Sequence, residues 1–187
     1  MLTNKNIVID PDKRLRTKCS EVNFPLSNED KQLINDLREY VINSLDEEKC
    51  EKYDISPAVG IAAPQVGITK QMCVVYIEFI DEENDKKEII DLQMINPKIM
   101  AYSEENIYLE NGEACLSIKE KYEGIVHRHA YIKVRYYDIN GKKHIIEAQD
   151  FLAIAIQHEI DHLNGILFYD HINKLAPFTP KPNSFPL

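Results

Sequence analysis

Hydrophobic residues recur every three to four positions along residues 27–45, a spacing that predicts a helix with one apolar face. Ser27 stands at the start of this pattern and Asp30 lies three residues later, which is typical of a helix start. The apolar face consists of Leu33, Ile34, Leu37, Val41 and Leu45. We expect this face to pack in the core.

A second helical segment, residues 150–165, is apolar on nearly every side, so we expect it to be buried. It opens with Asp150-Phe151-Leu152-Ala153-Ile154-Ala155-Ile156. Asp150 is predicted to be the N-cap. Gly165 is predicted to lie just past the last turn, where a left-handed conformation favours glycine.

Between the two helices, β-branched and aromatic residues predict strands. The first strand is expected at Gln71–Ile80 and the second at Glu88–Met100, with a charged connector, Asp81–Lys87, between them. Asn96-Pro97 is expected to interrupt the second strand. Two strands joined in this way predict antiparallel pairing.

Residues 122–149 alternate between apolar and polar positions, which predicts a hairpin whose tight turn is Asn140-Gly141. His127, His129 and His144 lie on or beside these strands. Because none of them belongs to a motif with another candidate ligand, we interpret them as surface or hydrogen-bonded histidines.

These elements predict an α+β fold in which antiparallel sheets pack around a buried central helix. The 187 residues fit a single domain, residues 1–187, with a proline-rich tail at about 173–187 that is not helical. Residues 10–26 contain Asp10-Pro11 and Phe24-Pro25, so we expect a loop-rich entry to the domain.

Composition limits the classes of function. A net charge of −9 argues against a general nucleic-acid surface, and no DNA binding is expected. We expect no membrane association, because no apolar run has the length of a membrane span. Four cysteines without paired spacing (Cys19, Cys50, Cys73 and Cys115) and a first segment unlike a signal peptide predict a cytoplasmic protein.

The chemistry is concentrated in the buried helix, which carries Gln157-His158-Glu159-Ile160-Asp161-His162-Leu163-Asn164-Gly165. His158 and His162 fall on one helix face about one turn apart, so both rings can reach one metal ion. Glu159 lies beside them and can reach a water on that ion. The same spacing also occurs by chance on solvated helices, but an apolar helix would bury these polar groups at a cost that a metal removes.

A catalytic metal needs a third protein ligand. The histidine of the metzincin pattern is replaced by Phe168, and the only acid after His162 is Asp170. His171 follows the helix and is a weak candidate. We therefore expect the third ligand upstream, although Cys115 taken alone fits an inert buried thiol better.

Two upstream segments are unusual. Pro57–Gly67 is small and apolar apart from Gln65, which fits either a buried turn or a segment that faces a ligand. The other segment is Glu110–Ser117, which contains Cys115.

Together, three segments resemble the motifs of the peptide deformylase family, in the family's order. They are Gly60-Ile61-Ala62-Ala63-Pro64-Gln65, Glu113-Ala114-Cys115-Leu116-Ser117 and the helical motif that ends at Gly165. The resemblance covers about residues 10–172. Ala58 and Ala114 stand where the family usually has glycine, which removes no functional atom. The connector length and the chain ending resemble the branch of the family common in Gram-positive-type bacteria.

The resemblance implies a metal-dependent hydrolase that removes the N-formyl group from the N-terminal formylmethionine of newly made polypeptides and releases formate. It implies metal binding by Cys115, His158 and His162, with Glu159 as general base on a metal-bound water and then as proton donor to the amine.

The family's pattern also implies that Gln65 and the backbone N–H of Leu116 stabilise the oxyanion. Substrate is expected to lie as an added strand beside Val59, Gly60 and Ile61 on one side and Gly112 on the other. Ile61 and the motif helix are expected to help line a methionine pocket.

One divalent metal ion is implied. Two imidazoles and a thiolate would suggest Zn²⁺, whereas the family usually holds Fe²⁺ and accepts Ni²⁺, Co²⁺ or Zn²⁺. The expected partners are an N-formylmethionyl peptide and, by resemblance only, the ribosome with its nascent chain. Two other classes stay open: a general metallopeptidase, which would use a histidine or carboxylate as third ligand, and a metal-binding protein without catalysis, which has no need of Glu159 or Gln65.

Overall fold

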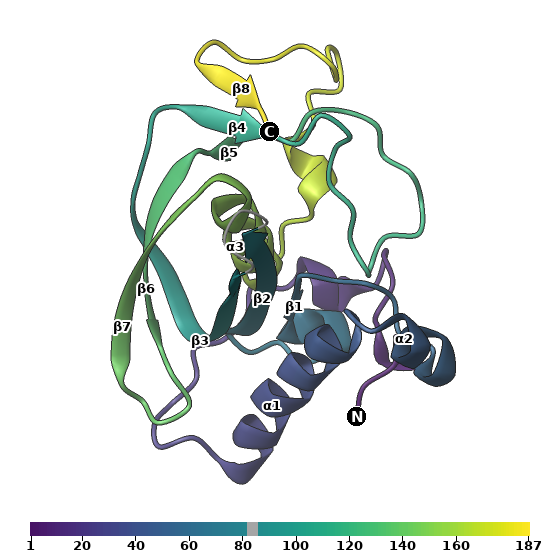
Figure 1. The fold of residues 1–187 in the computed structure, drawn as a ribbon, viewed down its shortest axis with the longest axis vertical. Coiled ribbons are helices and arrows are strands. Elements are labelled where there is room, and N and C mark those ends of the chain that lie inside the picture. Colours follow the sequence, from purple (N-terminus) through teal and green to yellow (C-terminus); the bar gives the residue numbers. More distant parts are fainter. Residues whose placement is uncertain (82–85) are drawn as a thin grey trace.

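The computed structural model describes residues 1–81 and 86–187, and it has the expected α+β fold with sheets around a central helix (Figure 1). Residues 82–85 of the predicted charged connector lie outside the described residues. The ends of that connector belong to the flanking strands. In the described part of the chain, no helix is both long and apolar enough to cross a membrane.

The helices are α1 (Asn28–Asn43), α2 (Glu47–Tyr53) and α3 (Asp150–Leu163), and short 3-10 helices lie at Asn4–Asn6, Lys13–Arg16, Ala63–Val66 and Phe168–His171. The strands are β1 (Gly60–Ala62), β2 (Met72–Asp81), β3 (Lys86–Tyr102), β4 (Asn106–Tyr108), β5 (Arg128–His129), β6 (Tyr131–Tyr137), β7 (Lys143–Gln149) and β8 (Ser184–Pro186). One sheet has the order β1-β2-β3-β6-β7 and the other β5-β4-β8.

α1 begins as predicted, because the Ser27 side chain accepts a hydrogen bond from the backbone N–H of Asp30 at 3.1 Å. Its apolar face packs against β1 and β2 in one core cluster. Leu45 was expected on this face, but the helix ends at Asn43 and Leu45 is 44% exposed.

α3 is the central helix, and its described neighbours include β2, β1, β5 and β7. The predicted N-cap was wrong: Gln149 is the N-cap, and Asp150 is the first helical residue with a φ of 54°. The C-terminus is as predicted. Gly165 has a φ of 73° and donates its N–H to His162, while Ile166 donates to Asp161, so the last carbonyls of α3 are satisfied.

Asn96-Pro97 does not interrupt β3 as expected. The strand runs from Lys86 to Tyr102, and Asn96 adopts a φ of 50° at a register shift between Ile95 and Lys98. Before this irregularity β3 pairs with β2, and beyond it β3 pairs with β6. The proline is tolerated because it sits at a bulge where the strand changes partner.

The predicted β6–β7 hairpin is present, with Gly141 in the left-handed conformation of its turn. The C-terminal tail was expected to be non-helical, and it ends in β8, which pairs in parallel with β4. The second sheet is therefore mixed rather than wholly antiparallel. The tail also donates the N–H of Lys181 to the ring of His127 at 3.0 Å.

Replacing Gly165 with alanine should destabilise the protein more than replacing Gly141. Both glycines have a positive φ, which costs another residue about 1–2 kcal/mol. At Gly165 a Cβ would also lie 2.6 Å from the backbone oxygen of Arg16, whereas at Gly141 it would meet only the ring of Phe24 at 3.0 Å. Thermal unfolding of the two variants measures the difference, and equal losses of Tm would contradict this account.

Candidate functional site

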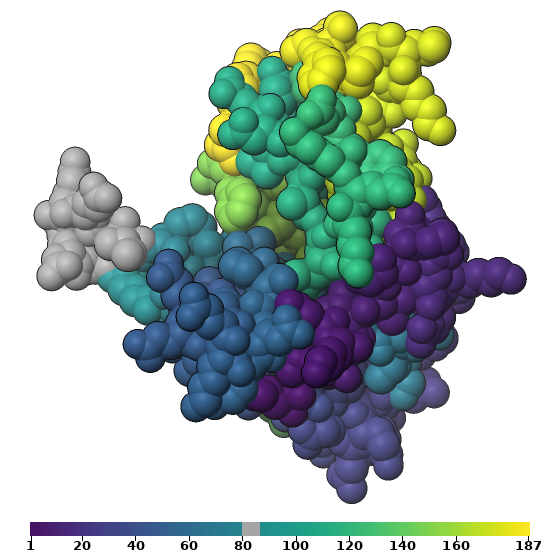
Figure 2. All heavy atoms as spheres, turned by 90° about the vertical axis from the view of Figure 1, so that its right-hand side faces the viewer, coloured from purple at the N-terminus to yellow at the C-terminus, as the bar shows by residue number. Residues whose placement is uncertain are grey.

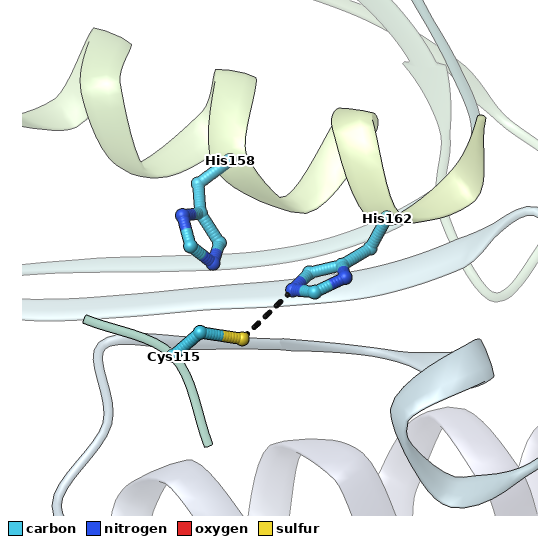
Figure 3. A group of neighbouring side chains, drawn as sticks. All are labelled: Cys115, His158 and His162. Atoms are coloured by element: carbon cyan, nitrogen blue, oxygen red, sulfur yellow. Dashed lines mark hydrogen bonds between the residues drawn. The ribbon is translucent and has the colours of Figure 1, made fainter. Parts of the chain in front are cut away.

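The last two turns of α3 carry His158 and His162, whose side chains point toward the loop that follows β4 (Figure 3). Cys115 lies on this loop, and its Sγ is 3.2 Å from Nε2 of His162. The three side chains each offer one donor atom, and these atoms all lie within 4.8 Å of one another. The structure thus brings together three residues from two distant parts of the sequence.

These donor atoms suit a metal ion. Ligand distances of about 2.0–2.3 Å in a tetrahedral site place neighbouring donors roughly 3.5 Å apart, close to the arrangement here. Burial and the neighbouring His158 lower the pKa of His162, so its ring is neutral and can offer a lone pair. Thiolate and imidazole are also the donors that intermediate metals prefer.

A cavity of about 450 Å³ opens beside the three side chains. Its wall includes Val59, Gly60, Gln65, Cys115, Leu116, His158 and Glu159 among the residues singled out from the sequence. In Figure 2 the surface is hollowed between the blue atoms of residues near 50–60 and the green atoms of the loop after β4. The two upstream segments therefore face α3 across one recess.

Two predicted substrate residues lie elsewhere. Ile61 is fully buried in the core cluster beneath α1, so its side chain is not part of the cavity wall. The reason is strand alternation, because Gly60 faces α3 and its neighbour Ile61 faces the opposite side of the sheet. Gly112 lines an adjacent cavity of about 460 Å³, which shares Glu113, Ala114 and Cys115 with the first.

Glu159 is buried against Gly60. A Cβ on Gly60 would lie 2.5 Å from Oε1 of Glu159, so only glycine leaves space for this carboxyl. Oε2 of Glu159 is buried and has no hydrogen-bond partner among the described residues. Burial raises the pKa of Glu159 from 4.5 to about 7. A buried carboxyl with this pKa is suited to exchanging protons near neutral pH.

Gln65 is 2% exposed and has a fixed orientation. Its Oε1 accepts the backbone N–H of Ala62 at 2.8 Å, which leaves Nε2 directed toward Sγ of Cys115 at 3.5 Å. The amide is therefore a donor that points into the site, as its apolar surroundings in the sequence suggested.

A buried ionic network lies behind His158. Glu113 accepts a hydrogen bond from Nδ1 of His158 at 2.7 Å, which directs the other ring nitrogen into the site. Arg128 donates to both oxygens of Glu113, at 2.7 and 2.9 Å. Burial alone would raise the pKa of Glu113, but hydrogen bonds from Arg128 and His158 outweigh it and lower the pKa to about 2.

The same network includes Asp161, which accepts hydrogen bonds from Arg128 and from the ring of His171. His171, the weak candidate for a third ligand, is thus bound to a carboxylate instead. His127, His129 and His144 also have hydrogen-bond partners outside the metal group, as expected. Sequence reasoning missed Arg128, because no spacing links it to Glu113 or Asp161.

Comparison with known proteins gives a consistent result. Residues 4–178 match the family model described as polypeptide deformylase. The peptide deformylase of Levilactobacillus brevis is 48% identical over 179 residues, which are 96% of this chain and 95% of the relative. That of Macrococcus caseolyticus is 49% identical over 177 residues, or 95% and 94% of the two chains.

Solved structures have the same fold. The class I type b peptide deformylase of Acinetobacter baumannii with bound Met-Ala-Ser has a TM-score of 0.70 and 30% identity, covering 89% of this chain and 96% of its own. The probable peptide deformylase of Synechococcus phage S-SSM7 has a TM-score of 0.69 and 35% identity, covering 89% and 98%.

Replacing Arg128 with methionine should destabilise the protein by about 3–5 kcal/mol, because it leaves the buried Glu113 carboxylate without its cation. The orientation of His158 then loosens, and metal affinity should fall by about 10- to 100-fold. The matched control is Arg38→Met, whose pair with Asp91 lies at the surface and contributes about 0–1 kcal/mol. Denaturant unfolding and metal titration test both variants. If both variants lost equally little stability and metal affinity, the role given to Arg128 would be refuted.

Proposed function

The chain belongs to the peptide deformylase family of metal-dependent hydrolases, which remove the formyl group from N-formylmethionyl peptides, and we propose that Cys115, His158 and His162 bind the metal ion. The observation that carries the proposal is the convergence of these three donor atoms within 4.8 Å beside the buried Glu159. The hydrogen bond from His158 to Glu113 supports it, because metal-binding histidines commonly have such a partner.

We propose Fe²⁺ as the resident ion, with Ni²⁺, Co²⁺ or Zn²⁺ able to replace it. A thiolate and two imidazoles suit all of these ions, so the choice of iron rests on the family resemblance. When bound, the divalent ion supplies Lewis-acid chemistry that polarises water and the formyl oxygen.

Glu159 is proposed to move the protons. Its carboxylate takes a proton from the attacking water and later gives a proton to the amine that leaves as formate is released. Both steps require a group that changes protonation readily near neutral pH, and burial places the pKa of Glu159 in this range. Because Gly60 has no side chain, the carboxyl of Glu159 has room to lie at the wall of the cavity.

Charge that develops on the formyl oxygen needs donors that are already in place. We propose Nε2 of Gln65 and the backbone N–H of Leu116 for this role. Gln65 is supported by its buried amide, whose oxygen is held by Ala62, and Leu116 by its place in the cavity wall next to Cys115. A fixed donor stabilises the charge without reorganising during the reaction.

β1 is an edge strand, so its free side can pair with an extended peptide. Val59 accepts the backbone N–H of Tyr76 on β2, and strand alternation therefore turns the polar groups of Gly60 toward the free side. We propose that the substrate backbone lies between Val59–Ile61 and Gly112. The methionine side chain would then enter the apolar part of the cavity at Val59, Phe151 and Ile154.

We further propose that residues 1–187 act as one catalytic domain with the tail at about 173–187. The cytoplasm and the ribosome with its nascent chain are the proposed setting, because formylated N-termini arise during synthesis. Four free cysteines fit a reducing compartment.

Cys115→Ala and Glu159→Gln should separate metal binding from proton transfer. Cys115→Ala removes a ligand and should lose the metal, while Cys50→Ala, outside the group, should keep it. Glu159→Gln should keep the metal and lower kcat by at least about 100-fold. Metal analysis measures metal binding in each variant, and turnover of a formylated peptide measures kcat. A stoichiometric metal in Cys115→Ala, or near-normal kcat in Glu159→Gln, would exclude the assigned roles.

The enzyme should hydrolyse N-formylmethionyl peptides at least about 100-fold more efficiently than N-acetylmethionyl peptides, measured as kcat/KM. An acetyl group adds one methyl next to the reacting carbon, and we expect little space there, since even a Cβ added to Gly60 would lie 2.5 Å from Oε1 of Glu159. A rigid pocket excludes an added group more strongly than packing favours it. Comparable cleavage of formylated, acetylated and internal peptide bonds would indicate a general peptidase.

A further inference from the structure

The segment from Ser56 to Val59 forms one wall of the catalytic cavity, yet it belongs to no helix or strand. Ser56, Pro57, Ala58 and Val59 all line the cavity and lead directly into β1. Val59 accepts the backbone N–H of Tyr76, but this bond does not determine the shape of Ser56 to Ala58, so other contacts must do so.

The first of these contacts comes from Ser44, the residue that caps the C-terminus of α1. The backbone N–H of Ala58 donates to Oγ of Ser44 at 3.1 Å, and the carbonyl oxygen of Ala58 lies 3.1 Å from the same hydroxyl. The hydroxyl also reaches the carbonyl oxygen of Val41 at 2.7 Å, so its one proton is shared between two carbonyls. Ser44 is 3% exposed, so water has little access to its hydroxyl.

A second contact holds the other end of the segment. Oδ1 of Asn4 accepts the backbone N–H of Ser56 at 3.0 Å and the hydroxyl of Tyr40 at 3.0 Å. Tyr40 is fully buried on α1, four residues before Ser44. One face of α1 therefore fixes Ser56 directly and through Asn4, and it fixes Ala58 through Ser44.

We propose that Ser44 is a positioning residue for the peptide substrate, and that it holds the cavity wall at Ala58 and Val59 in the shape that binds the peptide. Asn4 supports the same wall at Ser56. This inference rests on the proposed substrate path along β1. Ser44 touches neither the metal group nor Glu159, so its effect falls on binding and leaves the chemical step unchanged.

The position explains why the effect should be specific. Ala58 directly precedes Val59, whose carbonyl makes the first bond of this strand to β2. A shift of Ala58 would therefore move the start of the β1 edge along which the substrate is proposed to lie. A wall that is ordered before substrate arrives spares the ordering cost that binding would otherwise include. Loss of the hydroxyl would leave two polar groups of Ala58 without a partner and would allow the wall to move.

The test is Ser44→Ala in the metal-loaded enzyme, with Ser27→Ala as matched control. Ser27 caps the opposite end of α1, so its loss weakens the same helix without touching the wall. Ser44→Ala should raise KM for a formyl-Met-Ala-Ser peptide by about three- to tenfold, with kcat and metal content unchanged. Ser27→Ala should lower Tm and leave KM unchanged.

Binding of the product peptide Met-Ala-Ser, measured by calorimetry, should weaken by the same factor in Ser44→Ala, which gives a reading that does not depend on turnover. Asn4→Ala, at a partly exposed position, should show the same rise in KM and provides a second test if Ser44→Ala does not fold. An unchanged KM, or a fall in kcat without a change in KM, would overturn the proposal. Inactivity of the unmodified, metal-loaded enzyme would instead contradict the proposed function.

Discussion

The ion pair between Glu113 and Arg128 is the interaction on which the site depends. Both side chains are almost fully buried, and burial of either charge alone would be far too costly. Together they give His158 a fixed acceptor and tie the loop of Cys115 to β5, the strand that carries Arg128. The pair thus connects the loop that carries Cys115 to α3, and neither side chain of the pair belongs to the candidate metal group.

α3 combines two demands that conflict. A helix at the centre of a domain has to be apolar, while this helix also presents two histidines, a glutamine and a glutamate. Gln157 is satisfied by the backbone of His129, and His158 by Glu113. Within the part of the chain that the structure describes, Oε2 of Glu159 and Nδ1 of His162 have no hydrogen-bond partner. A buried polar atom without a partner lowers the stability of the fold, and such atoms are expected at functional sites.

The sequence predicted α1, α3 and the β6–β7 hairpin because each has a local signal: an apolar stripe, a helical motif with its closing glycine, and an Asn-Gly turn. Cys115, His158 and His162 remain predicted metal ligands; that prediction needed the family resemblance, and the structure brings their donor atoms within 4.8 Å of one another. Arg128 and β8 were missed because their partners are distant in sequence, and Leu45 was misplaced because periodicity does not show where a helix ends. Ile61 was predicted to line the cavity because the sequence does not show which side of the sheet each side chain of β1 faces.

The candidate metal group combines two side chains on a helix with one on a loop. His158 and His162 are fixed by the hydrogen bonds of α3, whereas Cys115 lies in a segment without regular structure. That segment is held before Cys115 by the bond between Glu113 and Arg128, and just after it by the N–H of Asp10, which donates to Ser117. Closer to its end, the N–H of Ile125 donates to Pro177 of the tail. Because a ligand on a loop binds only as well as the loop is closed, we expect these remote contacts to raise the metal affinity of the proposed site. The tail that adds β8 therefore bonds to the same loop that carries Cys115, although it lies outside all three motifs.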